Sequence, residues 1–322
     1  MNPKRLALAG AGLLALGIVL AVALRHGSSQ PAAVPTTTTT APPPATTTQP
    51  APPPPPTTTA PPPAPPTTTA PPPAPPPHVA MSWDHAGAIV WHTHDTDPDW
   101  LGQQLRSAGF GWVAVFLGSS GVADPPEAGW VVRFERSSGL PVGGWSVLGN
   151  EPAKDASLAA RLVKQNGLAF YIADAENTYE QAYGGWSRSQ AFVNAFRAAA
   201  PSLPAGLSSF CNANGLDLRA WAHAGFVFLP QAYVNDFGAS VAPAACVRSA
   251  TAVFPLSDIH PTVGSYKGKL GWVKAPRFSR LLAQAGTTGF SVYPAETAMY
   301  AEDWQAYGHA IASLHIAAAV GR

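Results

Sequence analysis

Charged residues are scarce in this 322-residue chain, where Asp, Glu, Lys and Arg together make up 11%. The first 80 residues contain no Asp or Glu at all. The remainder holds all 18 acidic residues and 16 of the 19 basic ones, so its net charge is near −2. Because nucleic-acid binding requires a concentrated basic surface, this balance argues against a nucleic-acid partner.

Cysteine is almost absent as well, with Cys211 and Cys246 the only two. Two cysteines are too few for a disulfide scaffold or a cysteine-based metal site, and no cofactor is expected. If the protein is exported, a disulfide between Cys211 and Cys246 is expected. It would cross-link two loops on the same face of the fold inferred below.

The N-terminal segment, residues 1–30, is the longest apolar stretch of the chain. Leu6–Leu24 is an unbroken run of 19 apolar or small residues after the basic start MNPKR. Such a run is just long enough to span a bilayer, but Ala21-Val22-Ala23 also offers a signal-peptidase site. The segment therefore predicts either a retained membrane helix or a cleaved signal peptide. Either way, we expect an extracytoplasmic protein of the cell envelope, anchored in the membrane or secreted.

Residues 31–80 form a separate, low-complexity region. Twenty-two of the 36 prolines lie between Pro31 and Pro77, alternating with clusters of threonine. Such a segment has little to bury and favours an extended polyproline II conformation. At about 3.1 Å per residue, 47 residues would reach roughly 150 Å when fully extended. We expect a disordered stalk that holds the next domain away from the membrane, with a passive tail as the alternative.

Residues 81–322 alternate short β-rich runs with segments of helical period. The expected strands are Ala88–His92, Trp112–Leu117, Pro141–Leu148, Leu168–Glu176, Ala205–Phe210, Phe226–Tyr233, Pro261–Tyr266 and Gly289–Tyr293. The expected helices are Pro98–Ala108, Glu127–Arg136, Asp155–Asn166 with Asp155 as N-cap, Ser187–Ala200, Leu216–Ala224, Ala242–Ala250, Pro276–Ala285 and Glu302–Ala319. Eight such units predict an α/β fold with a parallel sheet closed into a (β/α)8 barrel of the TIM type. An open doubly wound sheet is the alternative, but the first strand lacks the G-x-G-x-x-G turn typical of that fold.

The stretch LAFYIADAEN, residues 168–177, carries the strongest functional signal. Side chains alternate along a strand, so Asp174 and Glu176 are expected on one face at its C-terminal end. In barrel enzymes that end carries the chemistry. A carboxylate pair there suits glycoside hydrolysis, in which one acid protonates the leaving oxygen. The alternative is that one carboxylate caps a helix or pairs with an arginine.

FYIADAEN resembles the D-x-E motif on the fourth strand of the family 25 glycoside hydrolases, the muramidases, within the TIM-barrel hydrolase superfamily. GLSSF, FLPQAYVNDF, HPTVGSY and TTGFSVYPAE resemble strand signatures of exported, actinobacterial hydrolase-like proteins. The resemblance implies an O-glycosidase acting on polysaccharide or peptidoglycan. Glu176 would be the general acid, and Asp174 would orient an acetamido group of the substrate or support an intermediate.

One position departs from the muramidase pattern. Those enzymes carry a further Asp on the first strand, where AIVWHTH here supplies His92 and His94. A barrel that binds glycan without cleaving it is therefore the alternative function.

Five further residues are expected to contact substrate. Gln231 and Tyr233 share a face at the end of the sixth strand and could hydrogen-bond a sugar. Glu296 follows the eighth strand, where it could act as a second carboxylate. Trp145 and Tyr293 lie near strand ends, where aromatic faces suit stacking on sugars, although packing inside the barrel is the alternative for each.

The H-x-H pair His92 and His94 at the first strand supports a lesser alternative. Imidazole ligands at alternate positions can bind Zn²⁺, as in metal-dependent hydrolases. Such a site needs further ligands from later strands, and the sequence offers an incomplete set. His92 is therefore taken as a substrate contact, and no metal site is assigned.

Overall fold

In the computed structural model, the described residues are 81–179, 184–213, 215–296, 308, 309 and 312. The expected N-terminal helix and the Pro/Thr-rich stalk lie outside this range, and so does most of the helix expected over Glu302–Ala319. Within the described part of the chain, no helix combines the length and the apolar character needed to cross a bilayer.

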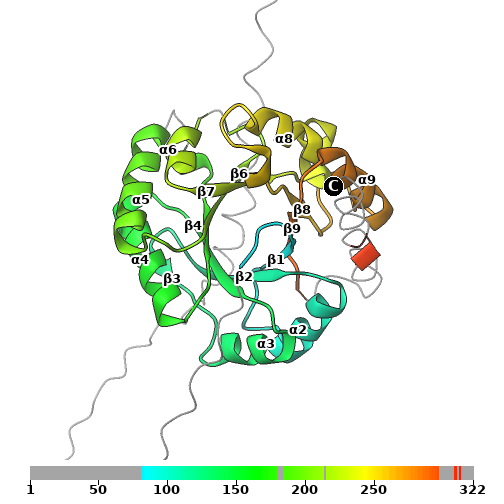
Figure 1. Cartoon of the computed structure of the whole chain (residues 1–322), viewed down its shortest axis with the longest axis horizontal. Helices are drawn as coiled ribbons and strands as arrows, with labels where there is room; N and C mark the ends of the chain where they lie inside the picture. The colour runs from blue at the N-terminus through cyan, green and yellow to red at the C-terminus, as the bar shows by residue number, and fades with distance from the viewer. Residues whose placement is uncertain (1–80, 180–183, 214, 297–307, 310–311, 313–322) are drawn as a thin grey trace, which may run out of the picture. The chain divides into compact units, whose positions relative to one another are not determined.

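Eight parallel strands close into a barrel (Figure 1). They are β1 (Ala86–Val90), β2 (Trp112–Ser119), β4 (Val142–Val147), β5 (Tyr171–Asp174), β6 (Ala205–Phe210), β7 (Phe226–Gln231), β8 (Thr262–Gly264) and β9 (Phe290–Tyr293). Each pairs in parallel with its neighbour in the chain, and β1 pairs with both β2 and β9. The short β3 (Val122–Ala123) pairs antiparallel with the end of β2. The predicted closed barrel is confirmed, and the open sheet is wrong.

Helices surround the barrel (Figure 1). They are α2 (Pro98–Ser107), α3 (Trp130–Ser138), α4 (Pro152–Gln165), α5 (Gly185–Ala199), α6 (Leu218–His223), α7 (Val234–Phe237), α8 (Pro243–Ala250) and α9 (Ala275–Ala285). The helix α2 begins as predicted, because Asp97 accepts a hydrogen bond from the Trp100 N–H and Pro98 occupies the first turn.

The expected start of α4 is wrong by one turn. The helix begins at Pro152 with Glu151 at the N-cap position, because Pro fits the first helical residue. Asp155 lies buried in the first turn of α4, and its Oδ2 accepts a hydrogen bond from the Gly149 N–H over 2.9 Å. Asp155 therefore holds the loop before the helix and does not cap its end.

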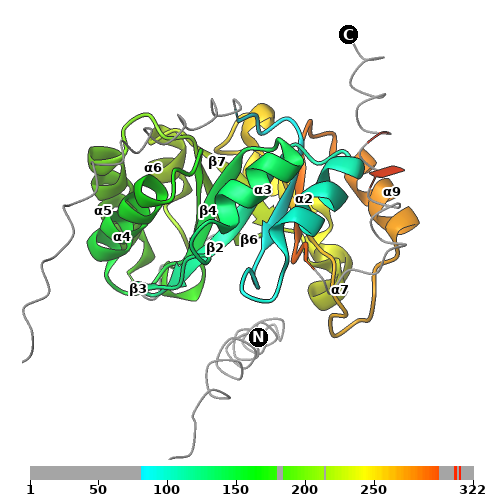
Figure 2. The same ribbon diagram turned by 90° about the horizontal axis from the view of Figure 1, so that it is seen from below.

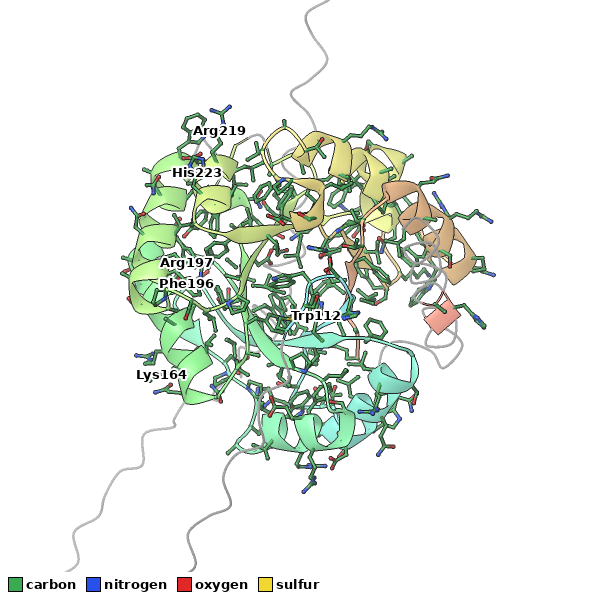
Figure 3. All side chains as sticks on the ribbon, viewed as in Figure 1. Trp112, Lys164, Phe196, Arg197, Arg219 and His223 are labelled. Atoms are coloured by element: carbon green, nitrogen blue, oxygen red, sulfur yellow. A yellow bond between two sulfur atoms is a disulfide. The ribbon has the colours of Figure 1, made fainter. Side chains whose placement is uncertain are left out.

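Alternating side chains divide the apolar residues into two cores. One lies between the sheet and the helices. The other fills the barrel and consists of Ile89, Trp112, Ala114, Phe116, Trp145, Phe170, Ile172 and Leu229. Figure 3 shows Trp112 near the middle of the barrel. A Cβ on Gly87 would lie 1.9 Å from the Trp112 ring, so the ring fits only because residue 87 is glycine.

The C-terminal ends of the strands meet at one end of the barrel. The antiparallel β3 extends from β2 at this end, and α7 follows β7 there, on the other side of the barrel (Figure 2). This end also carries the last residues of β5, β7 and β9, and barrel enzymes keep their sites at it.

Candidate active site

The strand β5 brings the two predicted carboxylates together. Asp174 is its last residue, and Glu176 follows two positions later, beyond the end of a strand that is shorter than expected. Ala173 and Ala175 alternate with them and are fully buried in the core beneath the helices. Asp174 and Glu176 therefore project from the inner side of the barrel, as the alternation predicted.

One side-chain amide binds both carboxylates. Nε2 of Gln231, the last residue of β7, donates to Oδ1 of Asp174 over 3.0 Å and to Oε1 of Glu176 over 2.9 Å. The hydroxyl of Ser208 on the intervening β6 lies 3.3 Å from the same nitrogen. Three neighbouring strands thus fix the pair, and Gln231, which was expected to contact substrate, is hydrogen-bonded to both carboxylates.

Burial controls the protonation of this pair. Removal from water raises the pKa of Asp174 well above its usual range, the charge of Glu176 raises it further, and hydrogen bonds from Ser208 and Gln231 oppose both effects. Burial also raises the pKa of Glu176, opposed by the bond from Gln231. A carboxyl pair with raised pKa values retains a proton at a pH where a solvated carboxyl has lost it. The site can therefore present a carboxylic acid for proton transfer.

Tyrosine rings form one side of the site. Tyr233 lies just after β7, Tyr293 ends β9, and Tyr266 follows β8. The ring centroids are 5.9 Å apart for Tyr233 and Tyr266, and 6.0 Å apart for Tyr233 and Tyr293. Burial raises the pKa of Tyr233 and of Tyr293 well above the usual value, so both hydroxyls stay neutral donors. These rings offer faces and hydroxyl groups to a sugar.

Trp145, another predicted contact, lies deeper. Only 3% of it is exposed, and its indole N–H donates to the Val90 carbonyl over 2.9 Å. Its ring is 5.9 Å from that of Tyr293 and 5.3 Å from that of Trp91. Trp145 thus supports the neighbouring rings from below and offers little ring surface to a ligand.

Glu296 joins the ends of β9 and β1. This carboxylate is 2% exposed and accepts hydrogen bonds from the N–H groups of Trp91 and His92, over 2.6 and 3.0 Å. Its other oxygen contacts Nδ1 of His92. Both oxygens are engaged by the end of β1, so Glu296 orients the imidazole of His92, whose side chain is 58% exposed.

The two histidines of the H-x-H pair have different partners. His92 is held by Glu296, whereas Nε2 of His94 lies 3.2 Å from Oδ1 of Asp124 near β3. Among the described residues, no three His, Cys, Asp or Glu side chains gather in a way that could hold a metal ion. The metal hypothesis therefore has no ligand set in this part of the chain.

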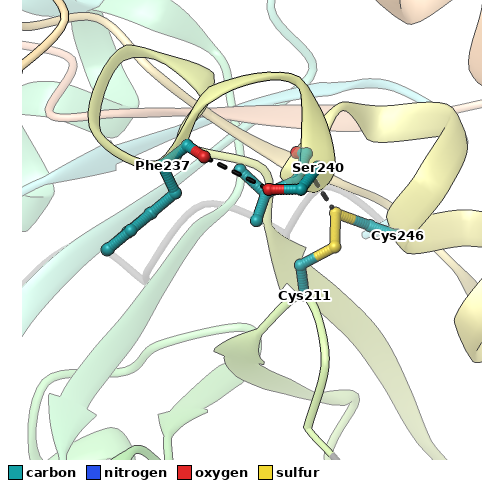
Figure 4. Close-up of a disulfide and its surroundings, with 5 residues drawn as sticks. Cys211, Phe237, Ser240 and Cys246 are labelled. Atoms are coloured by element: carbon teal, nitrogen blue, oxygen red, sulfur yellow. Dashed lines mark hydrogen bonds between the residues drawn. A yellow bond between two sulfur atoms is a disulfide. The ribbon is translucent and has the colours of Figure 1, made fainter. Parts of the chain in front are cut away.

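A disulfide lies beside the site. Cys211 directly follows β6, and Cys246 lies within α8, with 4.8 Å between their Cα atoms (Figure 4). The expected link between two loops is therefore wrong in one respect, because the second cysteine is helical. The bridge fastens the C-terminal end of β6, three residues after Ser208, to α8.

Sequence reasoning assigned no site role to two residues that complete this arrangement, Ser208 and Asp236. The hydroxyl of Tyr266 donates to Oδ2 of Asp236, and so the β8 end is bound to α7. Alternation along β8 places Tyr266, the partner of Asp236, on the same side as Thr262 and Gly264. This pattern could have assigned Tyr266 to the site. The contact with Asp236 joins residues 30 positions apart and leaves no local pattern.

Comparison with solved structures finds the same barrel fold in chitinases of glycoside hydrolase family 18. A family 18 chitinase from Pseudoalteromonas aurantia matches with a TM-score of 0.54 and 13% identity, over 71% of this chain and 99% of that one. A family 18 chitinase from Cycas revoluta, in complex with (GlcNAc)3, matches with a TM-score of 0.56 and 8% identity, over 72% and 99%. The active domain 2 of a Pyrococcus furiosus chitinase, complexed with chito-oligosaccharides, matches with a TM-score of 0.54 and 11% identity, over 75% of this chain and 98% of that one.

At these identities the likeness establishes the fold alone. No family model matches the sequence, and no curated protein matches it. The barrel therefore resembles family 18 chitinases at a distance, while the finer resemblance to muramidases stays a prediction.

Proposed function

We propose that the barrel hydrolyses glycosidic bonds in an N-acetylated glycan of the cell envelope or in another extracellular glycan. Glu176 is the general acid, and Asp174 is its partner. The observation that carries this proposal is that Gln231 donates hydrogen bonds to the buried carboxyl of Asp174 and the partly buried carboxyl of Glu176, both with raised pKa values. Such a pair supplies a proton to a leaving oxygen near neutral pH.

The geometry favours a substrate-assisted mechanism, in which a group of the substrate is the nucleophile. Both carboxyl oxygens bind one nitrogen, so they lie at most about 6 Å apart, short of the roughly 6.5–9.5 Å that an inverting pair needs for water. The two groups also come from one strand and face the same side of a bound sugar. Among the described residues, two other buried carboxylates lie near this end, and both are engaged: Glu296 by β1, and Asp155 by the Gly149 N–H. An acetamido oxygen of the substrate then attacks the anomeric carbon, as in substrate-assisted families.

Each residue has a distinct role in this scheme. Glu176 protonates the glycosidic oxygen as the bond to the anomeric carbon breaks, and later accepts a proton from the attacking water. Asp174, deeper in the barrel, accepts a hydrogen bond from the acetamido N–H and stabilises the positive charge that develops there. Tyr233 donates its hydroxyl to the acetamido oxygen, and Gln231 keeps the two carboxyls in place. His92, Tyr293 and Tyr266 contact the sugars at the rim.

The distant structural matches support the choice of glycan. Two of the matched chitinase structures hold (GlcNAc)3 or chito-oligosaccharides, which are N-acetylated. An acetamido group is the substituent that the scheme above requires.

The direct test measures release of reducing ends from GlcNAc oligomers and from purified envelope glycan by the full chain. We expect Glu176→Gln to lower turnover by about 100-fold or more. The matched control is Glu151→Gln, which changes a carboxylate that is 69% exposed at the start of α4. Unchanged turnover in Glu176→Gln would remove the assignment.

A barrel that binds glycan without cleaving it is the second candidate. It is favoured by the tight engagement of Glu296 and by His92, which stands where muramidases carry a further Asp. Glycan binding that survives the double change Asp174→Asn and Glu176→Gln, with no hydrolysis by the unchanged protein, would establish this alternative.

A further inference from the structure

Positive charge gathers in one segment next to the candidate site. Residues 259–295 contain five Lys or Arg and no Asp or Glu, although acidic residues outnumber basic ones in residues 81–322 as a whole. Three of the five, Lys267, Lys269 and Lys274, lie in the connection between β8 and α9 and are exposed. Residues 265–274 are called the basic tongue below.

The basic tongue is firmly held against α7. The Lys269 N–H donates to Oδ1 of Asp236 over 2.9 Å, and the Leu270 N–H donates to the Asn235 carbonyl over 2.8 Å. Nδ2 of Asn235 donates to the Tyr266 carbonyl over 2.9 Å. These bonds hold the first half of the segment, so Lys267 and Lys269 extend from a backbone that is fixed against α7.

The basic tongue begins inside the candidate site. Its second residue, Tyr266, has its ring 5.9 Å from Tyr233 and 6.4 Å from Tyr293. The charge of Glu176 is close enough to contribute to the raised pKa of Tyr266, after burial and Asp236. Lys267 is the next residue, with its Cα about 3.8 Å from that of Tyr266. Lys267 is exposed and directly follows a residue whose ring lies against the tyrosines of the candidate site.

Apolar side chains accompany the lysines. Phe237 at the end of α7 is 44% exposed, and Leu270 and Trp272 are 67% and 41% exposed. Nζ of Lys269 lies 6.0 Å from the centre of the Phe237 ring. Aromatic faces suit sugar rings, and a lysine ammonium is a point charge that binds carboxylate or phosphate. The combination fits a sugar polymer with negatively charged substituents.

We propose that the basic tongue binds anionic substituents of the glycan that enters the site, so the substrate is an N-acetylated polymer bearing carboxylate or phosphate groups. This inference rests on the proposed function, because it places the polymer in the same site. It goes further because it assigns negative charge to the substrate. The roles proposed for Asp174, Glu176 and the tyrosines do not depend on that charge.

The experiment compares dissociation constants in the Glu176→Gln background, which keeps ligands intact. The probes are a neutral GlcNAc oligomer, an oligomer of equal length with carboxylate substituents, and one with phosphate substituents. The test variant is Lys267→Ser with Lys269→Ser. The matched control is Lys164→Ser, in the last turn of α4, which leads to the start of β5 and so away from the C-terminal ends of the strands. Figure 3 shows Lys164 at the outer edge of the ring of helices.

We expect the unchanged tongue to bind at least one anionic oligomer more tightly than the neutral one, with a preference that weakens at high salt. The double lysine variant should lower that preference by about tenfold, and Lys164→Ser should leave it intact. The carboxylate and phosphate probes show which substituent is preferred.

Four results would overturn the proposal: no preference for either anionic oligomer, an equal preference in the double lysine variant, an equal loss in Lys164→Ser, or a double lysine variant that loses only its binding to vesicles of anionic lipid. The last result would assign the basic tongue to a membrane surface. Turnover of the neutral oligomer by the protein with Glu176 intact is measured separately. That turnover tests the proposed function independently of the binding results for the lysine variants.

Discussion

The side-chain amide of Gln231 donates to Oε1 of Glu176 over 2.9 Å, although the two residues are 55 positions apart. The same nitrogen also reaches Asp174. A single donor from β7 therefore sets the spacing of both carboxyls on β5 and partly offsets the effect of burial on their pKa values. Most of what the site can do chemically depends on this contact.

The first prediction concerns that donor. Gln231→Leu removes the hydrogen bonds that lower the pKa of Asp174 and of Glu176, so both pKa values should rise further. We expect kcat/KM to fall on the order of tenfold, and the pH–rate profile to shift to higher pH. The profile of kcat/KM on a GlcNAc oligomer measures this. A loss of rate with no shift, or a shift to lower pH, would show that Gln231 acts in some other way.

The second prediction concerns the cost of keeping Asp174 buried. A carboxyl whose pKa is raised by folding binds protons more readily in the folded state, so its burial destabilises the fold above that pKa. Asp174→Asn keeps an acceptor for Gln231 and removes the charge. We expect its free energy of unfolding at neutral pH to rise by roughly 0.5–2 kcal/mol, while turnover falls. The gain should shrink as the pH is lowered through the range where Asp174 takes up its proton. Urea denaturation at several pH values tests this, and a variant less stable than the unchanged protein at neutral pH would contradict it.

The third prediction concerns the opposite end of the barrel. His260 is fully buried, with its ring stacked on that of Trp83 at 6.3 Å, and burial lowers its pKa from 6.5 to about 4. The unfolded chain therefore binds a proton that the folded protein excludes between these values. The contribution of His260 to the free energy of unfolding should therefore fall by roughly 3 kcal/mol as the pH drops from about 6.5 to about 4.

The variant His260→Phe keeps a ring against Trp83 and removes this titration. Its free energy of unfolding should lose roughly 3 kcal/mol less than that of the unchanged protein over the same pH range. His223→Phe, in the last turn of α6, is the control and should follow the unchanged protein (Figure 3). Parallel curves for His260→Phe and the unchanged protein would contradict the assignment.

The fourth prediction concerns the disulfide. The Cys211–Cys246 bridge closes a loop with a sequence separation of 35 and fastens β6 to α8. Replacing both cysteines with Ala should lower the free energy of unfolding by about 2–4 kcal/mol. Urea denaturation of the unchanged protein with and without reductant should give a similar difference. A double variant as stable as the oxidised protein would show that the bridge adds nothing to the fold.

Much of the barrel and part of the site could be predicted from the sequence. The alternation of β-rich runs with helices gave the eight units, and alternation along one strand grouped Asp174 with Glu176, because a strand repeats every two residues. The same rule placed Gln231 and Tyr233 on one face at the end of the sixth strand. These patterns depend only on residues that are close together in the sequence, so the sequence alone reveals them.

Long-range contacts could not be predicted in this way. Glu296 and His92 meet across 204 positions, so neither residue shows in its own neighbourhood that it will be engaged. Asp155 looked like a helix cap because it precedes an apolar pattern, yet Pro152 starts the helix earlier and buries Asp155 within it. The expected first strand, Ala88–His92, also begins and ends two residues late, because pairing with β9 starts at Ala86 and the strand ends at Val90.

The central claim is that Glu176 is the general acid. Its most direct test compares the turnover of two substrates by the full chain and by its Glu176→Gln variant. One is a natural GlcNAc oligomer, whose leaving oxygen needs a proton, and the other is an aryl glycoside of the same sugars, whose phenolate leaves without one. Glu176→Gln should lower kcat on the oligomer by about 100-fold or more, and lower it far less on the aryl glycoside. Equal losses on both substrates, or no loss on the oligomer, would contradict the role of Glu176.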